Sequence, residues 1–299
     1  MSDALTNQVD RILLGEVVTL AFNPVDRDEA ARVVTAPATV TITDGDGTEV
    51  VSAAAATIAG DGKTLSYVTD PTKLAAYDSY TVVWSARYGA ATLSWQTALE
   101  VCGGHLFSIA TFQAQGGRLD TLTAAQVREA RRQAEDRFET ECDVAFVPRA
   151  ARVTVKAEDV YKLLLPHVAL RELYAVTVDD GTTETVLTET QLATIQIGDE
   201  LAGAGVAYRE DGDLWGKGDT VTLYYAHGYD RPAPHVSDAV MKLAREYVAP
   251  DGALPPRATS LSTDIGTFRI SVASREHPTG IPDVDSVIEL VGRKRPPVG

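Results

Sequence analysis

The chain has 299 residues, of which 44% are apolar and 23% are charged, and its formal net charge is −15. This composition is that of a folded protein long enough for two domains, and the apolar run Val50–Ala59 is far shorter than the roughly 20 residues that a membrane helix needs. The acidic excess, without a clustered basic segment, excludes a protein that grips nucleic acid through its phosphates. The N-terminus lacks a signal-peptide pattern, which predicts synthesis in the cytoplasm.

The first hundred residues show short segments that alternate apolar and polar side chains. Five are predicted as strands: VVTLAF, ATVTITD, TLSYVTD, YTVVWSARYG and ATLSWQTALEV. Turn sequences separate them at Asp44–Gly47, Asp61–Gly62 and Tyr88–Gly89. Strands at this spacing, with no helical pattern between them, predict an all-β sandwich over residues 1–104. Its architecture is immunoglobulin-like, but the Cys pair of antibody domains is missing.

A helix is predicted over residues 123–142, after a glycine-flanked junction at 103–120. Thr123 and Gln126 form a capping box, and apolar or small residues then recur on one stripe, at Val127, Ala130, Ala134, Phe138 and Cys142. Three arginines decorate this helix. Arg131 lies at the edge of the stripe, whereas Arg132 and Arg137 are spaced for i,i+4 pairs with acids.

Two interpretations of these arginines stay open. They belong to a solvated charged face, or Arg131, Arg132 and Arg137 form a subunit interface, in which Arg131 reaches a neighbouring subunit.

The rest of the chain predicts a β-rich insertion, a second helix and an extended tail. Strand-like alternation returns over about 150–230, with turns at Asp180–Gly181 and Asp211–Gly212. A helix over 236–249 is predicted with Ser237 as its cap and Pro250 as its stop, and its inward residues are Val240, Leu243, Ala244 and Tyr247 or Val248. Residues 251–299 contain six prolines and too little apolar sequence to offset the entropy of ordering alone. The fold class is therefore α+β multidomain, divided at 1–104, 105–250 and 251–299.

Motifs for catalysis and cofactors are missing from the sequence. It contains no GxSxG, HExxH or GxxxxGK[ST] pattern, so we expect no enzyme, no cofactor and no metal. The DGDGTE segment lacks the later ligands of a calcium loop and is interpreted as a hairpin turn. Cys102 and Cys142 are interpreted as buried free thiols. A hydrolase that uses acids of the insertion, such as Asp211 and Asp213, stays a minor alternative.

The order of four segments resembles a known family. The helix ending in CDVAFVPR, the insertion closing with VTLYYAHGYDRPAP, the helix HVSDAVMKLAREYV and the tail RATSLSTDIGTFRIS…TGIPDVDSVIELVGRKRPPVG together resemble head-to-tail connector adaptors of long-tailed, siphovirus-type bacteriophages. The resemblance covers about Leu106–Gly299. It implies a structural virion protein that forms a dodecameric ring under the portal, extends the DNA channel and joins capsid to tail.

The resemblance also implies a set of partners and a location. The partners are the portal protein, the next connector protein (a stopper or tail terminator), further copies of the chain, and genomic double-stranded DNA that passes through the lumen without sequence-specific binding. No membrane is involved. The location is the neck of the virion, and the host cytoplasm during assembly. An acidic lumen would repel phosphate and let DNA slide.

In this family an extended C-terminal segment reaches the portal, which assigns a docking role to the tail. Phe268 and Ile270 alternate with polar residues, as in a strand added to another sheet edge. An amphipathic turn that lodges in a groove of the partner is predicted at Ile281, Val284, Val287 and Ile288. The alternative is a disordered surface tail.

The N-terminal sandwich departs from the compact adaptors of this family. We expect it to project outwards, where it braces neighbouring subunits or decorates the virion surface. A function from another class is a modular binding protein, a tail or surface component that recognises glycan or protein through the sandwich. Trp84 and Trp95 would then stack on carbohydrate, although at strand spacing such residues are more often core.

Overall fold

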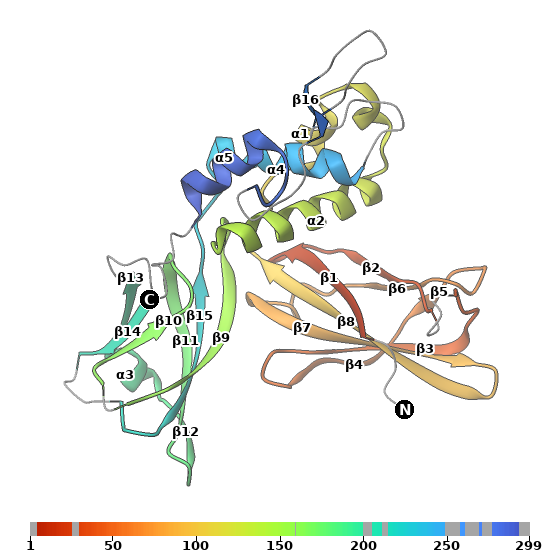
Figure 1. The fold of residues 1–299 in the computed structure, drawn as a ribbon. Helices are drawn as coiled ribbons and strands as arrows, with labels where there is room; N and C mark the ends of the chain where they lie inside the picture. The colour runs from red at the N-terminus through yellow and green to blue at the C-terminus, as the bar shows by residue number, and fades with distance from the viewer. Residues whose placement is uncertain are drawn as a thin grey trace. The chain divides into compact units, whose positions relative to one another are not determined.

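The computed structural model describes residues 5–25, 30–158, 160–199, 205–210, 215–248, 258–260, 269–270 and 277–292. The chain divides into two compact units (Figure 1). Unit 1 comprises Met1–Gly103, Arg149–Thr154 and Thr222–Ala226, and unit 2 comprises Gly104–Pro148, Val155–Val221 and His227–Gly299. Each unit has its own hydrophobic core, and the chain has the α+β multidomain fold that the sequence predicts.

Unit 1 is built around a sandwich of two sheets. Strands β1, β8, β7, β3 and β4 form the first sheet in that order, and β2, β6 and β5 form the second. Their bounds are β1 Leu5–Leu13, β2 Thr19–Phe22, β3 Thr35–Thr43, β4 Glu49–Ala55, β5 Thr57–Ile58, β6 Leu65–Val68, β7 Asp78–Tyr88 and β8 Ala91–Cys102. All neighbours pair antiparallel except β1 and β8, which are parallel. The five predicted strands are β2, β3, β6, β7 and β8, whereas β1, β4 and β5 were not predicted.

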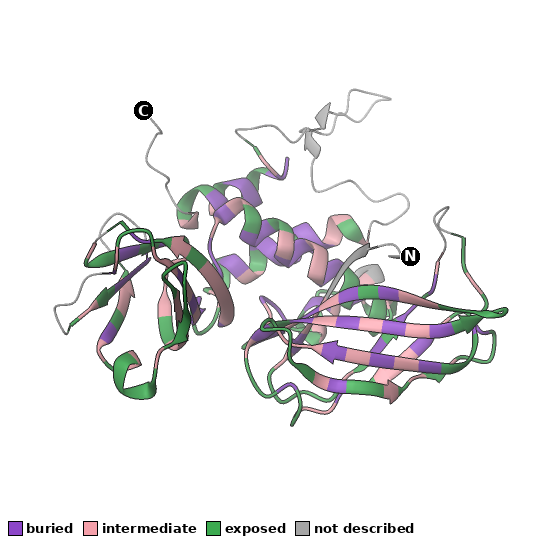
Figure 2. Ribbon diagram, turned by 90° about the horizontal axis from the view of Figure 1, so that it is seen from below, coloured by how far each residue is buried: buried purple, intermediate pink, exposed green. Residues whose placement is uncertain are grey.

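The two sheets enclose aromatic side chains. Trp84 is 1% exposed and Trp95 is 3% exposed, and both rings lie 5.9 Å from the ring of Phe22. Figure 2 shows the alternation of buried and exposed residues along these strands. Because both tryptophans fill the core, neither offers the stacking surface on which recognition of a glycan would depend.

The DGDGTE segment forms the turn between β3 and β4. The Asp44 carboxylate accepts hydrogen bonds from the backbone N–H groups of Asp46 at 3.0 Å and Thr48 at 2.8 Å, and Gly47 has a φ of 85°. A carboxylate that binds its own backbone in this way makes an Asx turn. The interpretation as a hairpin turn is confirmed.

An arginine on β9 (Arg149–Lys156) completes unit 1. Arg152 forms ion pairs with Asp46 and Asp78, and its guanidinium lies 3.9 Å from the centre of the Tyr224 ring. The Tyr224 hydroxyl in turn donates to the backbone carbonyl of Tyr77 at 2.5 Å. Burial alone would lower the pKa of Arg152, but the hydrogen bonds to Asp46 and Asp78 raise it above its ordinary value.

Helices from three parts of the sequence share the core of unit 2. They are α1 Ile109–Gln113, the 3₁₀ helix η1 Gly117–Thr121, α2 Ala124–Cys142, α4 Pro234–Tyr247 and α5 Pro282–Val291. Leu106, Phe107 and Phe112 also lie in this core. The segment 103–120, predicted as a junction, therefore contributes to the helical core. No helix in the described ranges is both long enough and apolar enough to cross a membrane.

A β-rich insertion separates α2 from α4, as predicted. Its elements are β9, β10 Lys162–Leu165, β11 Leu170–Asp179, β12 Glu184–Val186, the short helix α3 Glu189–Leu192, β13 Ile195–Asp199, β14 Gly205–Arg209 and β15 Thr220–His227. One sheet has the order β12, β11, β15, β9 and the other has the order β10, β14, β13. The predicted turn at Asp180–Gly181 joins β11 to β12, whereas Asp211–Gly212 lies outside the described residues.

The two ends of the insertion meet beside the helical core. The Tyr229 N–H donates to the Ala145 carbonyl at 3.2 Å. Gly228 has a φ of 97°, and a Cβ at this position would collide with the Val147 carbonyl. Glycine is required here both by the backbone conformation and by the close approach.

Candidate interaction surfaces

Helix α2 organises the helical core because both its start and its buried face are encoded locally. The Thr123 hydroxyl accepts from the Gln126 N–H at 3.3 Å, and the Gln126 side chain accepts from the Thr123 N–H at 3.0 Å. This is the capping box expected from the sequence. The predicted stripe is confirmed, since each of its members is at most 2% exposed: Val127, Ala130, Ala134, Phe138 and Cys142.

Charged side chains form a second buried row beside this stripe. The Glu135 carboxylate, 1% exposed, accepts from the Leu106 N–H at 2.7 Å. Arg131 donates to the Phe107 carbonyl at 3.3 Å, and Glu139 accepts from the Phe146 N–H at 3.1 Å. A buried backbone group needs such a partner, so these residues hold the segments on either side of α2 in place. Their i,i+4 spacing next to the apolar stripe was the available signal.

Arg131 differs from the sequence expectation. It was expected to reach a neighbouring subunit, but it is 9% exposed and binds a carbonyl of its own chain. The reason is that the segment around Leu106 and Phe107 covers this edge of the stripe. A helical periodicity gives no information about such a distant segment.

Arg132 and Arg137 lie on the less buried side of α2. Arg132 pairs with Glu129 at 2.6 Å and with Asp136 at 3.6 Å, and its hydrogen bond lowers the pKa of Glu129. Arg137 pairs with Glu141 at 2.9 Å and also donates to the Pro278 carbonyl at 2.7 Å. The predicted i,i+4 pairs are confirmed. Arg137 has a further role in holding the segment that leads into α5.

Helix α5 packs into a groove formed by α2 and α4. Ile281 is 3% exposed, Val284 is buried completely and Ile288 is 8% exposed, while Val287 packs partly buried against the same core. These residues were expected to lodge in a groove of the portal. The structure places them in a groove of their own chain, because α2 and α4 contribute apolar residues to the same core. The tail from 251 to 299 is therefore not wholly without an intramolecular core.

Polar contacts fix the start of α5. The Asp285 carboxylate, 7% exposed, accepts from the Thr279 N–H at 2.9 Å and from the Thr279 hydroxyl at 2.6 Å. Lys242 on α4 and Asp283 on α5 form an ion pair at 2.5 Å. At the other end, a Cβ on Gly292 would lie 3.6 Å from the Cα of Cys142, the last residue of α2. Helix α5 is thus anchored at both ends.

Helix α4 begins earlier than the sequence predicts. Its first residue is Pro234 and its N-cap is Ala233, so Ser237 lies within the first turn and is not the cap. Proline at the first helical position supplies a fixed φ and needs no partner for an N–H group. The inward residues Val240, Leu243 and Ala244 are confirmed as buried, whereas Tyr247 is 41% exposed.

The other two docking residues fall in the least described part of the tail. Phe268 lies outside the described residues. Ile270 belongs to the short strand β17 Arg269–Ile270, which pairs antiparallel with β16 Ala258–Ser260, and its partner in this register is Ala258.

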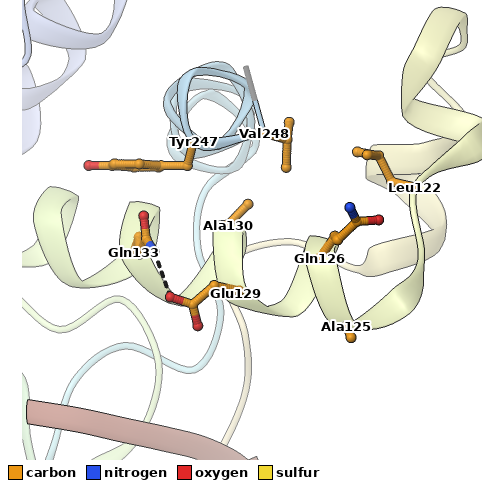
Figure 3. Close-up of a pocket in the computed structure, with 8 residues that line it drawn as sticks. All are labelled: Leu122, Ala125, Gln126, Glu129, Ala130, Gln133, Tyr247 and Val248. Atoms are coloured by element: carbon orange, nitrogen blue, oxygen red, sulfur yellow. Dashed lines mark hydrogen bonds between the residues drawn. The ribbon is translucent and has the colours of Figure 1, made fainter. Parts of the chain in front are cut away.

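A second groove between α2 and α4 is open. It has a volume of about 530 Å³ and is lined by Leu122, Ala125, Gln126, Glu129, Ala130, Gln133, Tyr247 and Val248. Figure 3 shows Tyr247, the last residue of α4, and its C-cap Val248 facing Ala130 and the two glutamines of α2. Gln133 donates to the Glu129 carboxylate at 2.5 Å. The groove is thus apolar at its floor and amide-lined at its rim.

Across the described ranges, no three His, Cys, Asp or Glu side chains are grouped in a way that could hold a metal ion. Neither Cys102 nor Cys142 forms a disulfide, and both thiols are buried, as predicted. Burial, together with the nearby Glu139 and Glu141, raises the pKa of the Cys142 thiol to about 12.

Comparison with known proteins finds distant structural likenesses. No family model and no curated protein matches the chain. Among solved structures it is similar to a protein from the neck of an empty gene transfer agent particle, computed with C6 symmetry, at 18% identity and a TM-score of 0.43, covering 65% of this chain and 93% of that one. A protein from the neck of the native particle, computed with C12 symmetry, has 18% identity and a TM-score of 0.41 over 66% of this chain and 97% of that one.

Likenesses to solved structures of titin fragments are more distant. A titin I-band fragment, I67–I69, has 13% identity and a TM-score of 0.20 over 74% of this chain and 62% of that one. The structural neighbours of the chain thus include proteins of gene transfer agent particles.

Proposed function

We propose that the chain is a head-to-tail connector adaptor, a structural subunit of a virion neck that forms a dodecameric ring under the portal and joins capsid to tail. The observation that carries the proposal is the assembly of one helical core from α2, α4 and α5 across a β-rich insertion. This is the order of segments that resembles the adaptor family. Because α2, α4 and α5 pack together although they lie far apart in the sequence, the segments in this order form one folded unit.

The docking contact with the portal is assigned to the strands of the tail. Among the described residues, strands β16 and β17 pair only with each other, and a sheet of two strands is marginally stable by itself. Addition of such a hairpin to a sheet of the partner would supply the missing backbone hydrogen bonds. Phe268 and Ile270 remain the proposed docking side chains, whereas Ile281, Val284 and Ile288 anchor the arm in an α2–α4 groove.

The contact between neighbouring subunits is assigned to the less buried side of α2. Arg132 and Arg137 lie on this side of α2. The open groove lined by Gln133 of α2 and Tyr247 of α4 lies between these two helices. The net charge of −15 supports a lumen that repels DNA phosphate, so that the genome slides without adhering. Replacing lumen acids with lysine is expected to slow genome ejection, and an unchanged ejection rate would remove the lumen role.

The deciding experiment adds the purified protein to portal rings and counts bound copies by native mass spectrometry and electron microscopy. The intact chain is compared with a variant in which residues 258–270 are replaced by a Gly/Ser linker of equal length, with α5 retained. We expect a ring on the portal for the intact chain and none for the linker variant, at the same melting temperature.

Two results would count against this proposal. Failure of the intact chain to bind any portal ring would end the adaptor assignment. Equal binding by the linker variant would move the docking contact away from β16 and β17.

A further inference from the structure

We propose that α5 is exchanged between neighbouring copies, so that in the assembled ring α5 of one subunit occupies the α2–α4 groove of the next. The inference rests on the proposed ring and adds to it the partner of one surface. The groove is the one filled by Ile281, Val284 and Ile288 within the described chain.

The helical form of α5 depends on the groove. It spans ten residues, and helices shorter than about 12 residues are marginal in water when isolated. Its residues Val284 and Ile288 are buried against α2 and α4, and the hydrogen bonds of Asp285 with Thr279 fix its first turn. Helix α5 is therefore stable only where an α2–α4 groove is available, but nothing in these contacts requires that the groove belong to the same chain.

Every contact that holds α5 is with a residue that each copy presents in the same way. Lys242 pairs with Asp283, Arg137 binds the Pro278 carbonyl, and the end of α2 at Cys142 receives Gly292. Exchange of an identical element conserves all of these interactions, which makes it a low-cost route to association. The form in which α5 lies in the groove of its own chain and the exchanged form therefore differ only in the course of the connection between α4 and α5.

The connection is long enough for exchange. Between Val248, the cap of α4, and His277 lie the paired strands β16 and β17, and the two stretches on either side of this pair, residues 249–257 and 271–276, can together span at most about 50 Å when extended. The same connection carries β16 and β17, the proposed portal contact. When the connection extends towards the portal, α5 leaves the groove of its own chain. In a ring the identical groove of the next subunit lies beside it at high effective concentration, so α5 binds there.

The exposed ion pair between Lys242 and Asp283 reports which chain supplies α5. Its side chains are 45% and 72% exposed and the two charged atoms are 2.5 Å apart, so a carbodiimide reagent can join them directly as an amide. Isotopically light and heavy chains are mixed in equal amounts, assembled on portal rings and treated with the reagent. Peptides that contain the Lys242–Asp283 bond are then identified by mass spectrometry. The variant Asp283→Asn, which loses the carboxylate on an exposed side chain, is the control for the assignment.

We expect about half of these cross-linked peptides to join a light to a heavy chain in the rings, and only same-isotope peptides in the free monomer. Same-isotope peptides alone in a formed ring would overturn the exchange and leave the adaptor role intact. Absence of the cross-link from the ring would also overturn it, because α5 would then have left both grooves. Failure to form rings would count against the adaptor role. Light and heavy chains would then be refolded together at high concentration, and the absence of cross-linked peptides that join a light to a heavy chain would contradict the exchange.

Discussion

Ile281 is a single side chain that distinguishes two roles of the tail. If it anchors α5 inside its own subunit, Ile281→Ala should lower the free energy of unfolding of unit 2 by about 2–4 kcal/mol, because the change removes buried methyl groups and leaves a cavity. Leu290→Ala, on the same helix but 73% exposed, should change it by less than about 0.5 kcal/mol. Chemical denaturation of both variants makes the comparison. Equal, small changes in the free energy of unfolding for both variants would mean that Ile281 does not anchor α5 in its own subunit and is available to a partner.

Cys142 links stability to pH in a defined direction. Its thiol has a pKa of about 12 in the folded chain against an ordinary value of 9.0, because burial and nearby glutamates favour the neutral form. Below pH 9 the thiol is protonated in both states, and its contribution to stability is complete. As pH rises from 9 towards 12, only the unfolded thiol ionises, so stability falls.

Cys142→Ala should therefore flatten the alkaline part of the stability profile relative to the parent chain. Denaturant titrations at a series of pH values measure this slope, with Val240→Ala as the control because it removes a buried side chain of the same core but no thiol. Parallel profiles for the parent chain and Cys142→Ala would contradict the assignment.

At the scale of elements, Arg152 ties strand β9 to the turn between β3 and β4. Arg152→Ala leaves the carboxylate of Asp78, which is 5% exposed, without the guanidinium, and breaking a buried pair of this kind costs about 3 kcal/mol. Asp46→Ala removes only the exposed arm of the same cluster and should cost less than about 1 kcal/mol. Thermal unfolding of unit 1 compares the two variants. A similar loss in both would show that burial of Asp78 is not the deciding factor.

Elements were predictable from the sequence where the signal is local. The stripe of α2, its capping box and the alternation in β7 each depend on residues within a few positions of one another, and each is found in the structure. Strand β4 was not predicted because its alanines, in EVVSAAA, do not alternate clearly. Strand β1 gains its place only by parallel pairing with β8, almost ninety residues later.

The placement of α5 depended on information that no local pattern contains. Proline-rich flanks and a short apolar group predicted a segment whose missing core is supplied by the portal. In the structure α5 packs instead against α2 and α4 of its own chain, which lie far from it in the sequence. The same reason explains why Arg131 was expected at a surface.

At the scale of the molecule, two separate cores predict two unfolding transitions. Val82 lies in the core of unit 1 and Val240 in the core of unit 2, and both are at most 1% exposed. Each replacement by alanine should lower the melting temperature of its own transition by several degrees and leave the other nearly unchanged. Differential scanning calorimetry shows both transitions in one scan. A single transition that moves with either variant would mean that the units unfold together.

The close approach of Gly228 to Val147 has a consequence for how this architecture can vary. Because the chain leaves the helical core after Val147 and re-enters it at Gly228, the β-rich insertion is closed at its base, like a loop pinned at one point. The geometry of α2 and α4 then does not depend on how many residues lie between them. Residues 155–221 of the insertion can therefore be lengthened or shortened while the helical core keeps its geometry, whereas 149–154 and 222–226 must stay because they also belong to unit 1.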